Sequence, residues 1–365
     1  MERRGGRKMN HLGILTLNPD PANPLYSGIG KESLSYPICL HLFSPEDLSP
    51  FTEGIEGYTY CRESGVWKED AFRIPEYLYD RTYYQAGKQQ QAKAVVQWLK
   101  QQPHVTFLGY GLPNKWILYE ELRKGPLAPY LPGTRLLKEV EDLTAFLNRE
   151  EEAIIKPVDG AHGFGIYHLR TNGPSIIVRT TKKDGILSHT FHNRDEFKRF
   201  TLRLMKKHTF LIQRRLENQV QDRPYDLRIH MAKDPSGNWQ EYHRAFRYGH
   251  PEGILTNVSS GAEYVPYDEW KAAHPGPPWA VMEEELKEIL SILPLELEER
   301  FSPLLELGID ITIGADHSIW LLDINSKPGH KLMQTGGLDS SELSRIPLDH
   351  CMNLSSQSAP TRSDH

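Results

Sequence analysis

The sequence predicts an α/β fold in which a small N-terminal domain precedes a larger pair of α+β lobes. Short apolar runs that read as buried strands alternate with stretches of helical spacing. The 365 residues are enough for two or three domains, each with its own core. The apolar fraction of 38% and the charged fraction of 25% are ordinary for a globular protein. A net charge of -5 gives no bulk attraction to nucleic acid.

The N-terminal domain is predicted at residues 11–111. Residues 1–10 read as a flexible basic tail, and they do not form a signal peptide because no long apolar region follows. Residues 12–17 and 37–43 are apolar runs that predict two buried strands, with Pro and Gly marking the loops between them. Residues 89–101 carry apolar side chains near helical spacing and predict a helix.

The two lobes are predicted within residues 112–330. Residues 139–149 predict a helix that buries Leu143 and Phe146. Residues 151–213 read as a lid lobe of strand, loop, two strands and a helix at 194–207, and residues 214–330 as a strand-rich C-terminal lobe with a helix at 282–293. Residues 336–365 are rich in Ser, Asp and Pro and are predicted to be a poorly ordered tail.

Three further features of the sequence bear on the classes of function that remain. No apolar run approaches the length that a membrane span requires, so we expect no membrane partner. The three cysteines, Cys39, Cys61 and Cys351, are widely spaced, have no metal-ligand spacing and indicate a reducing compartment. His230, His243 and His250 lie close in sequence but form no metal motif, and satisfied or surface histidines are the favoured interpretation.

A glycine-rich loop follows a strand that ends in a lysine. Residues 153–155 and 166–169 read as strands, and the segment between them contains Lys156, Gly160, Gly163 and Gly165. P-loops and Rossmann loops open a helix, whereas this loop joins two strands. Its backbone amides can surround phosphates, because glycine has no Cβ to block a close approach. An ordinary exposed hairpin turn is the alternative.

A second segment, residues 319–329, places Asp323 and Asn325 two positions apart on a predicted strand. Both side chains therefore point from the same face. Two oxygen ligands on one strand face suit Mg²⁺, which prefers a few carboxylates together with phosphate oxygens. Together with the lysine and the glycine loop, this segment predicts a site for a nucleoside triphosphate and a metal ion. An Asp and an Asn that cap a turn are the alternative.

These segments, with others in a fixed order, resemble the ATP-grasp superfamily and, within it, the YheC/YheD-type proteins associated with bacterial endospore coats. The likeness covers about residues 111–329 and rests on NKW at 114–116, YLPGT at 130–134, IKP at 155–157, LIQ at 211–213, DLR at 226–228, NVSSG at 257–261, LGID at 307–310 and DIN at 323–325. GVW at 65–67 and YDR at 79–81 support the narrower likeness. Asp323 departs from the Glu that the superfamily mostly has, and Gly261-Ala262 departs from Gly-Gly.

The resemblance implies an ATP-grasp fold with a small α/β domain ahead of it, and it implies a role for each site residue. The phosphates would meet Lys115, Lys156 and the loop glycines Gly160, Gly163 and Gly165, while adenine and ribose would meet Gln213, Leu216 and Glu217. Asn257 would lie near the γ-phosphate or the metal, and Arg228 and Arg247 would stabilise the transferred phosphoryl group. The ligands of Mg²⁺ would be Asp310, Asp323 and Asn325. This metal set offers only oxygen, which fits Mg²⁺ and disfavours zinc. Surface lysines, a plain strand exit after residue 213 and structural salt bridges of the arginines are alternatives, and Arg244 competes with Arg247.

The reaction that the resemblance implies is ATP-dependent ligation of a carboxylate to an amine through an acyl phosphate. The implied cofactors are ATP and Mg²⁺, and the implied partners are an unidentified carboxylate substrate and spore coat proteins. The implied location is the mother-cell cytoplasm, the spore coat or both. Two other classes stay open, namely a structural coat protein that retains the fold with little activity, and a small-molecule kinase.

Overall fold

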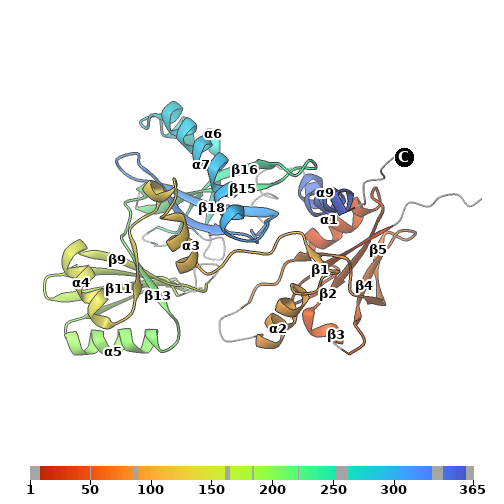
Figure 1. Ribbon diagram of the computed structural model, residues 1–365. Helices are drawn as coiled ribbons and strands as arrows, with labels where there is room; N and C mark the ends of the chain where they lie inside the picture. The colour runs from red at the N-terminus through yellow and green to blue at the C-terminus, as the bar shows by residue number, and fades with distance from the viewer. Residues whose placement is uncertain are drawn as a thin grey trace, which may run out of the picture.

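The computed structural model describes residues 9–49, 51–84, 89–160, 165–182, 185–220, 222–251, 253, 256, 262–330 and 340–358. Across these ranges the chain forms three β-sheets, one in the N-terminal domain, one in the lid lobe and one in the C-terminal lobe (Figure 1). A basic tail was predicted at residues 1–10. Residues 1–8 lie outside the described ranges, and Asn10 already belongs to the first strand.

The N-terminal domain is a mixed sheet covered by helices on both faces. Its elements are β1 (Asn10–Leu15), α1 (Pro24–Ser33), β2 (Ile38–Phe43), a 3-10 turn (Pro45–Asp47), β3 (Leu48–Ser49), β4 (Gly54–Cys61), β5 (Val66–Arg73), β6 (Tyr77–Asp80), α2 (Gln90–Leu99) and β7 (Thr106–Phe107). The strand order is β3-β4-β2-β1-β6-β7, with β5 beside β4, and β1 runs parallel to β2 and β6. The predicted strands at 12–17 and 37–43 and the predicted helix at 89–101 correspond to β1, β2 and α2.

The lid lobe is an antiparallel sheet with two helices on one side. Its elements are β8 (Thr134–Leu137), α4 (Val140–Glu150), β9 (Glu152–Pro157), β10 (Tyr167–Asn172), β11 (Ser175–Lys182), β12 (Gly185–Phe191), α5 (Arg194–Met205) and β13 (Phe210–Gln213). Leu143 and Phe146 of α4 are buried, which confirms the sequence prediction. Ile155 of β9 pairs with Tyr167 of β10, so the glycine-rich segment does join two antiparallel strands.

The C-terminal lobe is a second antiparallel sheet, and α7 packs on one of its faces. Its elements are α3 (Lys115–Leu122), a 3-10 turn (Ala128–Tyr130), β14 (Gln219–Val220), β15 (Arg223–Lys233), β16 (Trp239–Tyr248), β17 (Glu263–Pro266), α6 (Tyr267–Ala273), α7 (Trp279–Arg300), β18 (Glu306–Ile313) and β19 (Ile319–Asn325). The helix predicted at 282–293 is longer, and α6 was not predicted.

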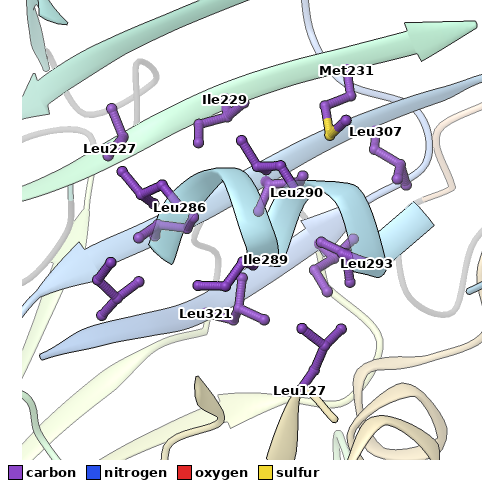
Figure 2. Packing of buried hydrophobic residues seen from close by; sticks show 14 of the residues in the cluster. Leu127, Leu227, Ile229, Met231, Leu286, Ile289, Leu290, Leu293, Leu307 and Leu321 are labelled. Atoms are coloured by element: carbon purple, nitrogen blue, oxygen red, sulfur yellow. The ribbon is translucent and has the colours of Figure 1, made fainter. Parts of the chain in front are cut away.

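The core of this lobe occupies one face of the sheet, so the side chains on the other face are the ones available to a binding site. Figure 2 shows Leu286, Ile289, Leu290 and Leu293 of α7 packed over Leu227, Ile229 and Met231 of β15 and Leu307 of β18. These strand residues carry odd numbers, because successive side chains of a strand point to opposite faces. The even-numbered side chains of β15 and β18 therefore lie on the face turned away from α7, and several of them are charged.

The C-terminal tail is ordered where disorder was predicted. Residues 340–358 form α9 (Ser340–Ser358), and Leu343, Ile346, Leu348 and Cys351 are buried in the same core as α1 (Figure 1). The prediction is therefore wrong for this segment. Its apolar residues recur at helical spacing, and the high content of Ser and Asp hid this stripe from a reading based on composition. Residues 336–339 and 359–365 lie outside the described ranges.

None of the helices that the structure describes is both long and apolar enough to cross a membrane.

The burial of α9 predicts a measurable contribution to stability. Leu348 has 0% of its surface exposed, so Leu348→Ala should lower the free energy of unfolding by about 2–5 kcal/mol, the usual cost of such a cavity. Leu295→Ala is a matched control, because the side chain of Leu295 is 63% exposed. Urea unfolding of both variants would measure the difference, and equal stabilities would mean that α9 does not pack on the N-terminal domain.

Candidate functional site

A β-bulge in β19 turns its polar side chains away from the core. Asp310 pairs with Asp323 across β18 and β19, but Ile311 pairs with Leu321, so Leu322 is an extra residue. Leu321 and Ile324 both pack in the α7 core although they are three positions apart. The bulge therefore shifts the alternation by one, and Asp323 leaves the core side of the sheet. Without it, a regular strand would carry Asp323 to the same face as Leu321.

Three segments from different parts of the chain meet at Asp323. Asn114 caps α3, since its side chain accepts hydrogen bonds of 3.1 Å from the amides of Trp116 and Ile117. Lys115, the first residue of this helix, forms an ion pair with Asp323. Lys156, near the end of β9, donates from Nζ to the carbonyl oxygen of Leu322 at 3.1 Å. The cap of α3, the end of β9 and the bulge of β19 thus bring both predicted lysines close to Asp323, one of the three predicted metal ligands.

Lys156 lies in a weakly solvated position. Burial lowers the pKa of its ammonium to about 8, although the carboxylate of Asp323 opposes this change, and the nearby Lys115 adds to it. The amine is therefore mostly protonated at neutral pH but loses its proton as the pH rises through about 8, far below the range of an ordinary lysine. A polyanion that enters this space would be attracted by both lysines and would raise the pKa of Lys156.

Arg228 and Arg247 form a buried ion network with two carboxylates. Arg228 donates to Asp310, and Arg247 Nη2 lies 2.8 Å from the same carboxylate oxygen. Arg247 also binds Asp226 through two hydrogen bonds of 2.6 Å, and Thr256 donates to Asp226 as well. Two cations and two anions are thereby balanced on one face of β15, β16 and β18. The structural salt bridge that was the alternative for the arginines is present, and the two hydrogen bonds to Asp226 fix the plane of the Arg247 guanidinium.

The pKa values of the two carboxylates shift in opposite directions. Burial acts to raise the pKa of Asp310, but Arg228 and then Arg247 outweigh it, so the pKa lies below its usual value. Burial raises the pKa of Asp226 despite the opposing effect of Arg247. The lowered pKa of Asp310 keeps this carboxylate ionised, as a metal ligand must be.

Arg247 rather than Arg244 borders the predicted metal site. Arg244 pairs with Glu241 and lies over the ring of Tyr267, 4.9 Å from its centroid. Tyr267 packs in the α7 core, so this guanidinium lies on the side of the sheet away from Asp310. The ambiguity between the two arginines is resolved by this difference of face.

An apolar cavity adjoins the two lysines. It lies between α3, the 131–134 segment, β13 and β19, and is lined by Leu118, Tyr119, Leu122, Leu131, Pro132, Thr134, Leu211, Gln213 and residues 321–324, with Lys115 and Lys156 at its edge. Apolar walls next to two cations suit a ligand with a flat apolar part and an anionic part.

The three residues predicted to meet adenine and ribose lie around this cavity in different ways. Gln213 lines the cavity, but its amide is engaged, because Nε2 donates to Thr134 Oγ1 at 2.9 Å. Leu216 is partly buried and lines an adjacent hollow together with Tyr119 and Trp320. Glu217 is exposed. The structure thus brings Gln213 to the cavity and places Leu216 and Glu217 beyond it.

Only part of the glycine loop is described. Gly160 is exposed, and Gly165 has a φ of +75°, a conformation that favours glycine. Gly163 and Asn257, two of the predicted nucleotide contacts, lie outside the described residues. Asn325 lies on β19 opposite Gly308 of β18, partly exposed and two residues beyond Asp323.

A second buried cluster, not found from the sequence, joins the N-terminal domain to the C-terminal lobe. Tyr79 donates to Glu306, and Arg81 lies 3.8 Å from the same carboxylate. Nε2 of His230 and Nε2 of His330 lie 3.2 and 2.7 Å from Glu306. Burial acts to raise the pKa of Glu306, but the histidines and Arg81 hold it well below its usual value. The signal in the sequence that could have revealed this cluster is the carboxylate of Glu306 inside the otherwise apolar run 304–309.

The chain is similar to known proteins in sequence and in fold. The family model described as YheC/D like ATP-grasp matches residues 104–354. The endospore coat-associated protein YheC of Bacillus subtilis (strain 168) is 33% identical over 350 residues, which cover 95% of this chain and 96% of that protein.

Two solved structures share the fold. D-cycloserine synthetase DcsG aligns with a TM-score of 0.57 and 13% identity over 94% of this chain and 100% of its own. The ATP-grasp ligase PsnB, solved with a phosphomimetic variant of its minimal precursor, Mg and ADP, aligns with a TM-score of 0.53 and 13% identity over 94% of this chain and 99% of its own. The predicted ATP-grasp fold is thereby confirmed.

A substitution at Gly308 tests the packing of Arg228 against Asp310 in the buried ion network. A Cβ at this position would lie 2.5 Å from Arg228 Nη2 and 2.8 Å from Pro328 Cβ. Gly308→Ala should therefore displace the guanidinium from Asp310 and lower stability by about 1–3 kcal/mol, as overpacking does. Gly276→Ala is the control, since no atom lies within 4 Å of its added Cβ. Melting temperatures of both variants measure the effect, and a Gly308→Ala variant as stable as the control would contradict the packing.

Proposed function

This chain belongs to the YheC/D-like ATP-grasp family, and from that membership and the site we propose that it is an ATP- and Mg²⁺-dependent ligase that joins a carboxylate to an amine. The observation that carries the proposal is the convergence of Lys115 and Lys156 on Asp323 at the edge of an apolar cavity. The family relation and this geometry point to the same ligand, a purine nucleotide with its phosphates beside the two lysines.

The nucleotide would lie between the lid sheet and the C-terminal sheet. Adenine would occupy the apolar cavity near Gln213, with Leu216 beside the ring and Glu217 toward the ribose. The phosphates would be bound by Lys115, Lys156 and the amides of the loop that contains Gly160, Gly163 and Gly165. Asn257 would contact the γ-phosphate or the metal ion.

The donor set on β18 and β19 fits Mg²⁺. Asp310, Asp323 and Asn325 offer two carboxylates and one amide oxygen, and no nitrogen or sulfur ligand lies among them. When bound, the ion would neutralise charge on the β- and γ-phosphates. Lys115 would move from Asp323 to the phosphates, because a cation beside that carboxylate competes with a metal ion for it.

The proposed reaction has two steps. A carboxylate oxygen of the substrate attacks the γ-phosphorus, the bond to the bridging oxygen breaks, and ADP and an acyl phosphate form. An amine then attacks the acyl carbon, phosphate leaves and an amide results. The chain's own residues would act by positioning and charge neutralisation. Arg228 and Arg247 keep N–H donors that are not used by Asp226 and Asp310, and these donors would face the transferred phosphoryl group.

The likeness to an endospore coat-associated protein supports an association with the spore coat, with coat proteins as partners and the mother-cell cytoplasm, the coat or both as the location. One observation favours a second candidate, a structural coat protein with a retained nucleotide-binding fold. Both arginines and Lys115 already have carboxylate partners, so the described site is stable as it stands.

The pKa of Lys156 predicts how nucleotide affinity depends on pH. Phosphate binds the protonated amine, whose pKa is about 8, so the affinity for Mg·ATP should fall as pH rises through that value. Lys156→Arg stays charged and should flatten the dependence, whereas Lys156→Ala should bind about tenfold to a hundredfold more weakly at neutral pH. Calorimetric titrations between about pH 7 and pH 9.5 measure this. Identical pH profiles for wild type and Lys156→Arg would remove Lys156 from the phosphate site.

Trapping of the acyl phosphate tests the reaction class. With Mg·ATP and a panel of carboxylates, amino acids and short peptides, hydroxylamine should intercept the intermediate as a hydroxamate, with one ADP released for each hydroxamate formed. Asp323→Asn and Asn325→Ala should each abolish ADP release and leave the melting temperature nearly unchanged. A stable phosphorylated product without hydroxamate would indicate a kinase. Tight ATP binding without ADP release on any substrate would favour the structural coat protein.

A further inference from the structure

The parallel pairing of β1 and β2 brings two histidines and a cysteine together. His11 lies opposite Cys39, and Gly13 lies opposite His41, so all three side chains belong to one face of the N-terminal sheet. One ligand atom of each residue, His11, Cys39 and His41, lies within 4.8 Å of the others. Nitrogen and thiolate ligands of this kind suit zinc and other borderline cations rather than Mg²⁺.

Hydrogen bonds fix the protonation of His41. Thr59 Oγ1 donates its single proton to Asp70 Oδ2 at 2.8 Å, so it can only accept at its 2.9 Å contact with His41 Nδ1. His41 Nδ1 therefore carries the proton, and the lone pair of His41 Nε2 accepts a hydrogen bond from His11 Nδ1, 3.0 Å away. A metal-bound histidine in proteins has this arrangement, with its second nitrogen donating to an outer partner.

The site is rigid on one side and open on the other. His41 is 3% exposed and its ring stacks on Phe72 with centroids 4.2 Å apart. Burial lowers the pKa of His41 to about 4, so it is neutral and able to bind a metal ion at neutral pH. His11 stacks on His41 with ring centroids 5.3 Å apart, but it is exposed, which gives a cation a path of entry and leaves a coordination position toward solvent.

We propose that His11, Cys39 and His41 form a binding site for a zinc-type divalent cation, with Thr59 and Asp70 as outer partners that orient His41. The charged side chains that act on Cys39 are Asp70 and Arg62, which have opposite signs. Burial raises the pKa of the Cys39 thiol, so cation binding would release its proton. His11 lies at the start of β1, whereas the parallel neighbour β6 contacts the 327–328 segment at its other end, so this site is separate from the nucleotide cleft.

The cluster of His230, Glu306 and His330 offers similar ligands but does not support the same inference. Nδ1 of each histidine is buried without a hydrogen-bond partner, so metal binding at Nε2 would leave two buried N–H donors unsatisfied. Arg81, 3.8 Å from Glu306, would also repel a cation. The outer partners of His41 therefore distinguish the two clusters.

Titration of the full chain, free of any affinity tag, with Co²⁺ alone tests the proposal. Wild type should bind one Co²⁺ with a thiolate-to-cobalt charge-transfer band that Zn²⁺ abolishes by displacement. Cys39→Ser should lose the band. His11→Gln, a surface change, should weaken binding at least about tenfold, and Thr59→Val should weaken it about tenfold while keeping the band. Cys61→Ser is the matched control from the neighbouring strand β4 and should behave as wild type.

Several results would overturn the site. These are the absence of stoichiometric Co²⁺ binding to folded wild type, loss of the band in Cys61→Ser, and unchanged affinity in His11→Gln. If Cys39→Ser failed to fold, the variants His11→Gln and Thr59→Val would decide the question alone. Because the readout is an absorption band, it does not depend on ATP turnover.

Discussion

Asp310 is a buried carboxylate, and a buried carboxylate must be paired with cations or take up a proton. Its partner Arg228 comes from the adjacent strand β15 and its partner Arg247 from β16, one strand further away, and both arginines are themselves nearly buried. Arg247 then requires Asp226, which in turn accepts from Thr256. One buried charge thus requires a connected polar network on the face of the C-terminal sheet that is turned away from α7. The opposite face is free to be apolar and to receive α7 (Figure 2).

Local patterns were sufficient to predict much of the site. The strand, glycine loop and strand around Lys156 form the expected hairpin, because alternation and glycine content are properties of neighbouring residues. Asp323 and Asn325 do project from one face, as two positions in a strand must. The order of short motifs also indicated the fold correctly.

Features that depend on distant pairings could not be predicted. The extra residue Leu322 can be recognised only once β18 is beside β19, and it decides which face Asp323 occupies. His41 lies two positions from Cys39 on β2, but the third member of the cluster, His11, reaches Cys39 only through the parallel register of β1 and β2. α9 was missed for a different reason, since its helical spacing is a local signal that the high content of Ser and Asp hid. Only its docking against the core of α1 depends on a distant contact.

The central claim is that Mg·ATP occupies the cleft between the lid sheet and the C-terminal sheet. The most direct measurement is a crystal structure of the chain with Mn²⁺ and a non-hydrolysable ATP analogue, with the cation located by its anomalous signal. The account predicts the anomalous peak among Asp310, Asp323 and Asn325, with Lys115 and Lys156 on the phosphates and the ion pair of Lys115 with Asp323 broken. An ordered nucleotide outside this cleft, or Lys115 still paired with Asp323 beside a bound nucleotide, would contradict it.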